Sequence, residues 1–236
     1  MSGLETMQLT LRLFSDHVLA LDAIRLGYIS SALMILGYWI YIRHALVDGF
    51  DPNPSTWFMF AYGTTLLTVL EFDKDAEWYL LLTPIACALL SIWVALICWR
   101  RGTLRWPDAW EDRIAFILDI LLTIAYVSAW CIATYGLIET FTEADREEAA
   151  HLFLIFSNMT TVTAFAPLII ATFRNPSEEY APAWTVWTLS YITLGIATLQ
   201  SEGTMLTELM IYPVLCTILH GLVAVLARSS MRRVVA

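Results

Sequence analysis

The sequence predicts an all-α integral membrane protein with seven transmembrane helices, arranged as two parallel three-helix repeats joined by a linker helix. Three observations lead to this fold class: an apolar composition, seven long apolar blocks, and an order of features that occurs twice. Hydrophobic residues make up 58% of the 236 residues and charged residues only 15%. A soluble domain usually carries about 25% charged residues, so this composition indicates a chain that is embedded in a bilayer.

The apolar residues form blocks of the length that a membrane crossing requires. A helix needs about 20 predominantly apolar residues to cross the hydrocarbon core. The predicted spans are 24–42, 55–70, 78–98, 114–138, 149–173, 183–200 and 205–227. Residues 1–23 lack the basic start and continuous apolar core of a signal peptide. Their helical spacing of apolar residues predicts either a surface helix or a direct lead into the first span.

The basic residues predict the orientation, because Lys and Arg near the ends of spans favour the cytoplasmic side. If the loop after the third span is cytoplasmic, nine basic residues lie on that side and four on the outer side. The nine are Arg43, Arg100, Arg101, Arg105, Arg113, Arg174, Arg228, Arg232 and Arg233, and the four are Arg12, Arg25, Lys74 and Arg146. We expect a multi-pass protein of the plasma (inner) membrane with its N-terminus outside and a basic cytoplasmic tail at 228–236.

The repeat is predicted from features that recur in the same order. The stretches TPIACALLS and YPVLCTILH each place a cysteine three residues after a proline, at Pro84 and Cys87 and again at Pro213 and Cys216. One span earlier, Trp57 matches Trp184. These matches predict a first repeat at 24–98, a loop and linker helix at 99–140, and a second repeat at 141–227. Apolar sequences match easily by chance, so an unrelated seven-helix bundle is the alternative.

This arrangement resembles the SWEET sugar transporters and the wider PQ-loop (MtN3-like) superfamily, a known case of parallel repeats. The stretch PSTWFMFAYG is similar to the second helix of that family, with Ser55, Trp57 and Gly63 at the matching positions. The resemblance implies alternating access between the two repeats. The Pro-Gln dipeptide of the family is missing, and Thr83–Pro84 and Tyr212–Pro213 stand where sugar carriers tend to place an asparagine, which implies a different cargo.

The predicted site follows from interrupted helices at matching places in the two halves. Such pairs indicate the substrate site in repeat transporters, and a proline inside a helix leaves a backbone carbonyl without its usual partner. The predicted substrate-binding residues are Tyr62, Pro84, Cys87, Asn158, Tyr191, Pro213 and Cys216. The predicted gate residues are Pro54, Trp57, Pro167, Pro182 and Trp184. The alternative for the cysteines and tryptophans is ordinary packing and an interfacial belt.

Two ionisable residues fall inside predicted spans, where a charge is expensive and often functional. Asp119 and His220 are candidates for coupling protons to transport. The structural alternatives are an ion pair between Asp119 and Arg113, and a hydrogen bond from His220 to a backbone carbonyl.

The predicted function is movement of a small neutral solute by alternating access, with the bilayer and the solute as partners. The alternative is a non-transporting subunit or scaffold of a larger membrane complex, and self-association is open. The sequence has no basic patch of the kind that binds nucleic acid. It also has no nucleophile–base pair, phosphate loop or metal-ligand spacing, so we expect neither an enzyme nor a cofactor or metal.

Overall fold

The computed structural model describes residues 3–47, 52, 54–103, 110–138 and 141–235, with side chains chiefly between residues 22 and 228. Within these residues the chain is all-helical. The long helices are α1 (Gly3–Val47), α2 (Pro54–Asp73), α3 (Trp78–Arg100), α4 (Trp110–Tyr135), α5 (Glu143–Arg174), α6 (Ala181–Glu202) and α7 (Ile211–Val235). Two short 3-10 turns, η1 (Pro176–Glu178) and η2 (Glu208–Met210), precede α6 and α7.

Five of the described helices are long and apolar enough to cross a membrane. They contain the segments Asp22–Val47, Trp78–Arg100, Phe116–Tyr135, Ala144–Arg174 and Glu208–Arg228, and they indicate a membrane-embedded protein. The helices α2 and α6, which the sequence analysis also predicts as spans, are not in this set. Both are long enough, but their threonines, tryptophans and tyrosines lower the mean hydropathy.

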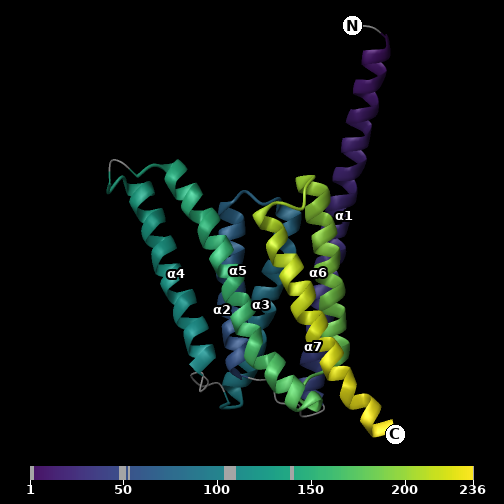
Figure 1. Cartoon of the computed structure of the whole chain (residues 1–236), viewed down its shortest axis with the longest axis vertical. Helices are drawn as coiled ribbons and strands as arrows, with labels where there is room; N and C mark the ends of the chain where they lie inside the picture. Colours follow the sequence, from purple (N-terminus) through teal and green to yellow (C-terminus); the bar gives the residue numbers. More distant parts are fainter. Residues whose placement is uncertain (1–2, 48–51, 53, 104–109, 139–140, 236) are drawn as a thin grey trace.

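The helices run alternately up and down, so the two ends of the chain lie at opposite ends of the bundle (Figure 1). Helix α1 packs against α3 and α6, α2 packs against α3 and α5, and α7 packs against α5 and α6. Helix α4 lies at one side, against α5 and to a smaller extent α2. The predicted N-terminal segment continues α1 without a break and extends beyond the bundle.

The contact between α1 and α6 depends on small residues and reciprocal hydrogen bonds. The Ser30 hydroxyl donates to the Ser190 carbonyl at 2.8 Å, and the Ser190 hydroxyl donates to the Ser30 carbonyl at 2.8 Å. Thr83 of α3 donates to the Ser30 hydroxyl at 2.8 Å. Small residues allow membrane helices to approach closely, and hydroxyl groups can then bond across the interface. This cluster fixes α1 against both of its neighbours.

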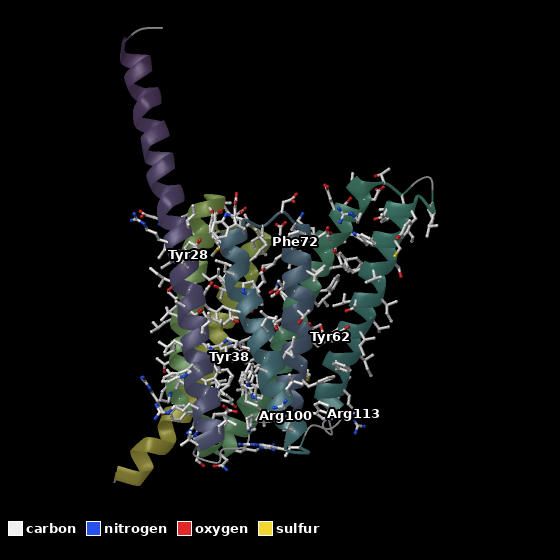
Figure 2. All side chains as sticks on the ribbon, turned by 180° about the vertical axis from the view of Figure 1, so that it is seen from behind. Tyr28, Tyr38, Tyr62, Phe72, Arg100 and Arg113 are labelled. Atoms are coloured by element: carbon white, nitrogen blue, oxygen red, sulfur yellow. The ribbon has the colours of Figure 1, made fainter. Side chains whose placement is uncertain are left out.

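The two ends of the bundle differ in charge. Arg100 and Arg113 lie at the end where the C-terminus emerges, and Phe72 lies at the other end (Figure 2). At that other end, ion pairs join the end of α2 to α5 and η2. Asp73 pairs with Arg146, Lys74 lies 3.5 Å from Glu208, and His151 lies 3.0 Å from the same carboxylate. We call these five residues the ionic bridge, and we call the two ends the arginine-rich end and the acidic end.

Gly27→Ala should destabilise the fold, because a Cβ at Gly27 would lie 2.6 Å from the Tyr79 carbonyl oxygen and force α1 away from α3. The matched control is Gly221→Ala, whose Cβ would lie 3.5 Å from a Thr188 methyl group, an ordinary contact. We expect a lower melting temperature for Gly27→Ala only, measured by thermal unfolding in detergent. Equal melting temperatures for the two variants would contradict the close packing of α1 on α3.

Candidate functional site

A small cavity lies at the centre of the bundle, and all seven long helices contribute to its wall. Its free space is about 30 Å³, enough for about two water molecules. The wall consists of Met34, Tyr38, Trp57, Met59, Phe60, Gly63, Thr64, Cys87, Asp119, Thr160, Thr161, Ala164, Phe165, Trp184, Trp187, Tyr191, Tyr212, Cys216 and His220. The predicted substrate-binding residues come from the second, third, fifth, sixth and seventh spans, and the proton-linked candidate Asp119 adds the fourth, so α1 is the one helix that the sequence analysis does not expect at this site.

Buried aromatic rings close the cavity toward the arginine-rich end. The Trp57 ring packs 4.9 Å from Tyr41 and 5.9 Å from Trp187, measured between ring centroids. The indole of Trp57 donates to the Tyr41 hydroxyl at 3.1 Å, and that of Trp184 donates to Glu179 at 2.7 Å. Bonded indoles in a packed cluster hold fixed orientations. We call Tyr41, Trp57, Trp184 and Trp187 the aromatic floor.

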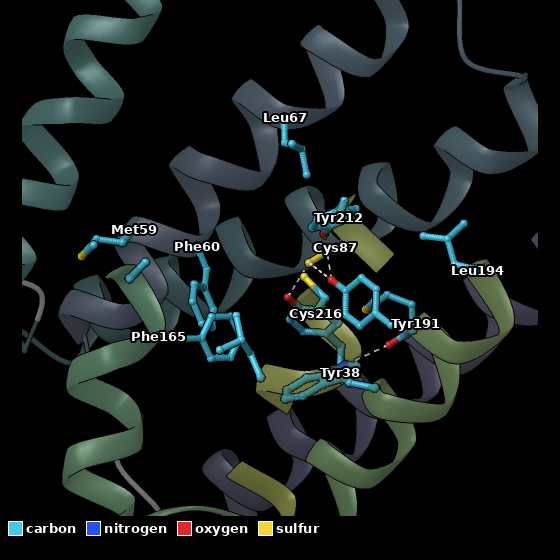
Figure 3. Packing of buried hydrophobic residues seen from close by; sticks show 14 of the residues in the cluster. Tyr38, Met59, Phe60, Leu67, Cys87, Phe165, Tyr191, Leu194, Tyr212 and Cys216 are labelled. Carbon is cyan, nitrogen blue, oxygen red and sulfur yellow. Dashed lines mark hydrogen bonds between the residues drawn. The ribbon is translucent and has the colours of Figure 1, made fainter. Parts of the chain in front are cut away.

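Hydroxyl and thiol groups from four helices meet on another part of the wall (Figure 3). The Tyr191 hydroxyl lies 2.8 Å from the Tyr212 hydroxyl and 3.6 Å from the Cys87 sulfur. The Tyr38 hydroxyl lies 3.3 Å from the same sulfur and 2.5 Å from the Ser91 hydroxyl. These groups can both donate and accept hydrogen bonds, so this wall can adapt to a polar solute.

Asp119 and His220, the two ionisable candidates, both line the cavity, and each has a hydrogen-bond partner. Asp119 accepts a hydrogen bond from the Thr160 hydroxyl at 2.5 Å. Nδ1 of His220 lies 2.8 Å from the Cys216 carbonyl oxygen, which is the structural alternative that the sequence analysis gives for this histidine. None of the ion pairs formed by the described residues includes either side chain.

Several predicted site residues therefore meet at one place. Of the predicted substrate-binding, gate and proton-linked residues, the cavity wall includes Cys87, Tyr191, Cys216, Trp57, Trp184, Asp119 and His220. The tryptophans come from the first turns of α2 and α6, Cys87 from the middle of α3 and Cys216 from the second turn of α7. Matching positions in the two halves of the sequence thus face a common space.

Other predicted residues lie away from this wall. The Tyr62 hydroxyl bonds the Thr123 hydroxyl of α4 at 2.7 Å, and the Asn158 amide donates to the Leu154 carbonyl of its own helix at 2.9 Å. Pro84 and Pro213 are buried inside α3 and α7, outside the cavity wall. Pro54 and Pro182 are half-buried at the starts of α2 and α6, a position that proline favours. Pro167 lies in α5, and its side chain is outside the described residues.

The sequence analysis misses several residues of the wall, chiefly Tyr38, Trp187 and Tyr212. The sequence matches Trp187 with Phe60 across the repeat, and both residues line the cavity. That recurrence is a signal that could have found this pair. Tyr38 lies four residues after Met34 on α1, so the two share one helix face, but nothing in the sequence shows which way that face points.

No family of known proteins, no curated protein and no solved structure matches the chain. A functional proposal therefore has to rest on the cavity, on the helices that form it and on the closures at its two ends.

Trp187→Ala should destabilise the protein strongly, because this fully buried ring contacts Tyr38, Trp57 and Trp184. Removing a large buried aromatic side chain costs about 3–5 kcal/mol. The control is Trp93→Ala, because the Trp93 side chain is 59% exposed and should matter little to folding. Unfolding by denaturant in mild detergent measures both free energies. Similar losses in the two variants would contradict a packed aromatic floor.

Proposed function

We propose that the chain is a membrane transporter that moves a small solute by alternating access between α1–α3 and α5–α7. The observation that carries this proposal is a single central cavity whose wall takes matched residues from both units, Trp57 with Trp184 and Cys87 with Cys216. A site at the interface of two repeats is the usual arrangement in repeat transporters. The proposed architecture is the 3+1+3 form, with α4 as the linker.

The neighbour relations of the helices support this architecture. If α1 is exchanged with α5, α2 with α6 and α3 with α7, the six main packed pairs among these helices map onto one another, and only the smaller α3–α6 contact has no counterpart. The pair α1–α3 becomes α5–α7, α2–α3 becomes α6–α7, and α1–α6 becomes α5–α2. Helices α1 and α5 run in the same direction (Figure 1), which favours parallel units. Helix α4 has no counterpart in this exchange.

The proposal treats α2 and α6 as membrane spans, although their hydropathy is lower. A helix rises about 1.5 Å per residue, so the 20 residues of α2 and 22 of α6 extend over about 30 Å, the thickness of the hydrocarbon core. Both have neighbours on two sides in the bundle. Their polar side chains therefore point largely into protein, which reduces the need for lipid-compatible side chains.

The two closures of the cavity suggest how access alternates. At the acidic end, the ionic bridge joins α2 to α5 and η2, across the boundary between the units. At the other end, the aromatic floor joins α1 and α2 to α6. In the proposed cycle, one closure opens while the other stays shut. In the proposed orientation, which rests on the distribution of Lys and Arg, the acidic end faces outside and the arginine-rich end faces the cytoplasm.

Glu208→Gln should increase access to the cavity from the acidic end, because it removes the charge that Lys74 and His151 share. Cys87 and Cys216 are buried in the closed form and serve as reporters in a Cys98→Ser/Cys131→Ser background. We expect at least about threefold faster modification by a membrane-impermeant maleimide added at that face, since breaking one pair of the bridge costs about 1 kcal/mol.

The control for this experiment is Glu202→Gln, which removes one exposed charge at the same end of the bundle. It should leave the labelling rate unchanged. Equal labelling in both variants would contradict a closure made by the ionic bridge, and simultaneous labelling from both faces would indicate a channel.

The alternative function, a non-transporting subunit, has its own support in the tryptophans left bare on the helix surface, Trp39, Trp93 and Trp99. Native mass spectrometry after gentle extraction from the host membrane distinguishes a free-standing transporter from a non-transporting subunit. We expect a lone or self-associated chain, with or without a retained small molecule. A stoichiometric foreign subunit would overturn the free-standing transporter and favour the scaffold.

A further inference from the structure

Asp119 is a buried carboxylate with most of its hydrogen-bonding capacity unused. Its side chain is 2% exposed and lines the central cavity, at the place where α4 packs on α2 and α5. One oxygen, Oδ1, accepts the bond from Thr160, and no hydrogen bond from a described residue reaches Oδ2. An ionised carboxylate offers about four lone-pair sites. The second oxygen is therefore available to a ligand that carries hydrogen-bond donors.

The hydroxyl groups around Asp119 are arranged to support an ionised carboxylate. The Thr160 hydroxyl lies 2.5 Å from Asp119 Oδ1 and 2.8 Å from the Ser157 carbonyl oxygen, but it has only one hydrogen to donate. Thr161 also donates to the Ser157 carbonyl, at 3.2 Å. The hydrogen of Thr160 can therefore go to Asp119 without leaving the carbonyl unbonded. Because an unpaired charge inside a membrane protein is strongly unfavourable, the ionised form of Asp119 is stable here only with a cation beside it.

The cavity leaves space next to Asp119 Oδ2 and extends toward aromatic rings. A Cβ added to Gly63 would lie 3.6 Å from Asp119 Oδ2, so the missing side chain leaves that oxygen uncovered. Phe60 and Phe165, one turn away on α2 and α5, pack with ring centroids 4.7 Å apart and line the same cavity as the tryptophans. Aromatic faces attract cations, and tryptophan does so most strongly.

We propose that Asp119 anchors a site for a small primary alkylammonium cation, of the size of methylammonium. The ammonium group donates to Asp119 Oδ2 and to the Thr161 hydroxyl, while the alkyl group lies against Phe60 and Phe165. The free space of about 30 Å³ restricts the closed form to a ligand of this size. This proposal rests on the proposed function, and it replaces the neutral solute that the sequence analysis expects by a cation.

Titration of the purified full-length protein in detergent, followed by tryptophan fluorescence at constant ionic strength, tests the site. The probes are methylammonium chloride, methanol as its neutral analogue, and sodium chloride. We expect a saturable response to methylammonium only. Asp119→Asn keeps the side-chain shape but removes the charge, so Kd should rise at least about tenfold.

A pair of glycine variants provides a second test that does not alter the carboxylate. Gly63→Ala fills the space beside Asp119 Oδ2 at an ordinary contact distance, so it should fold normally and raise Kd by about threefold or more. Gly195→Ala makes an equivalent contact, 3.7 Å from Pro213, outside the central cavity, and should bind like the wild type. If Asp119→Asn fails to fold, the comparison of Gly63→Ala with Gly195→Ala tests the cation site on its own.

Equal responses to methanol and methylammonium, or an unchanged Kd in Asp119→Asn or Gly63→Ala, would overturn the cation site. Uptake of labelled methylammonium into proteoliposomes tests the proposed transport function separately from the cation site. Binding that depends on Asp119 without uptake supports the site and overturns transport. Uptake at equal rates by the wild type and Asp119→Asn supports transport and overturns the site.

Discussion

The need to satisfy polar groups inside an apolar bundle shapes this structure more than any other constraint. No water is present in the hydrocarbon core, so buried hydroxyls must find partners within the protein. Most of the threonines do so on their own helix: Thr64, Thr68 and Thr188 each donate to the carbonyl four residues earlier. Buried polar groups that have no such partner on their own helix therefore stand out. Tyrosine hydroxyls, cysteine thiols and one carboxylate instead face a shared central space.

The two ends of the bundle are held together by different physical interactions. The ionic bridge consists of charged side chains whose attraction depends on distance and on the surrounding medium. The aromatic floor consists of fully buried rings, whose contribution comes mainly from apolar burial and from edge-to-face contacts. Because each interaction responds to different conditions, each end of the cavity can be weakened separately.

Much of the fold could be predicted from the sequence, because seven apolar blocks separated by charged loops leave few alternatives. The predicted start of the third span, residue 78, is the first residue of α3, whereas the predicted first span begins well inside α1. Four of the seven cavity residues found in advance, Cys87, Cys216, Trp57 and Trp184, recur in both halves. Tyr62, which the sequence analysis predicts as substrate-binding, bonds Thr123 of α4 and lies outside the cavity wall. The apolar residues of α2 are spread around the whole helix, so its sequence cannot indicate which face points inward.

The ionic bridge links the molecule to the salt content of its surroundings. The side chains of Asp73, Arg146, Lys74 and Glu208 are 14–22% exposed, so dissolved ions reach them. Charge attraction is screened over about 8 Å at physiological ionic strength and over about 3 Å at 1 M salt. Concentrated salt would therefore weaken the ionic bridge and leave the apolar contacts of the aromatic floor intact. A bundle built in this way carries a dependence on salinity at its acidic end and none at its aromatic floor.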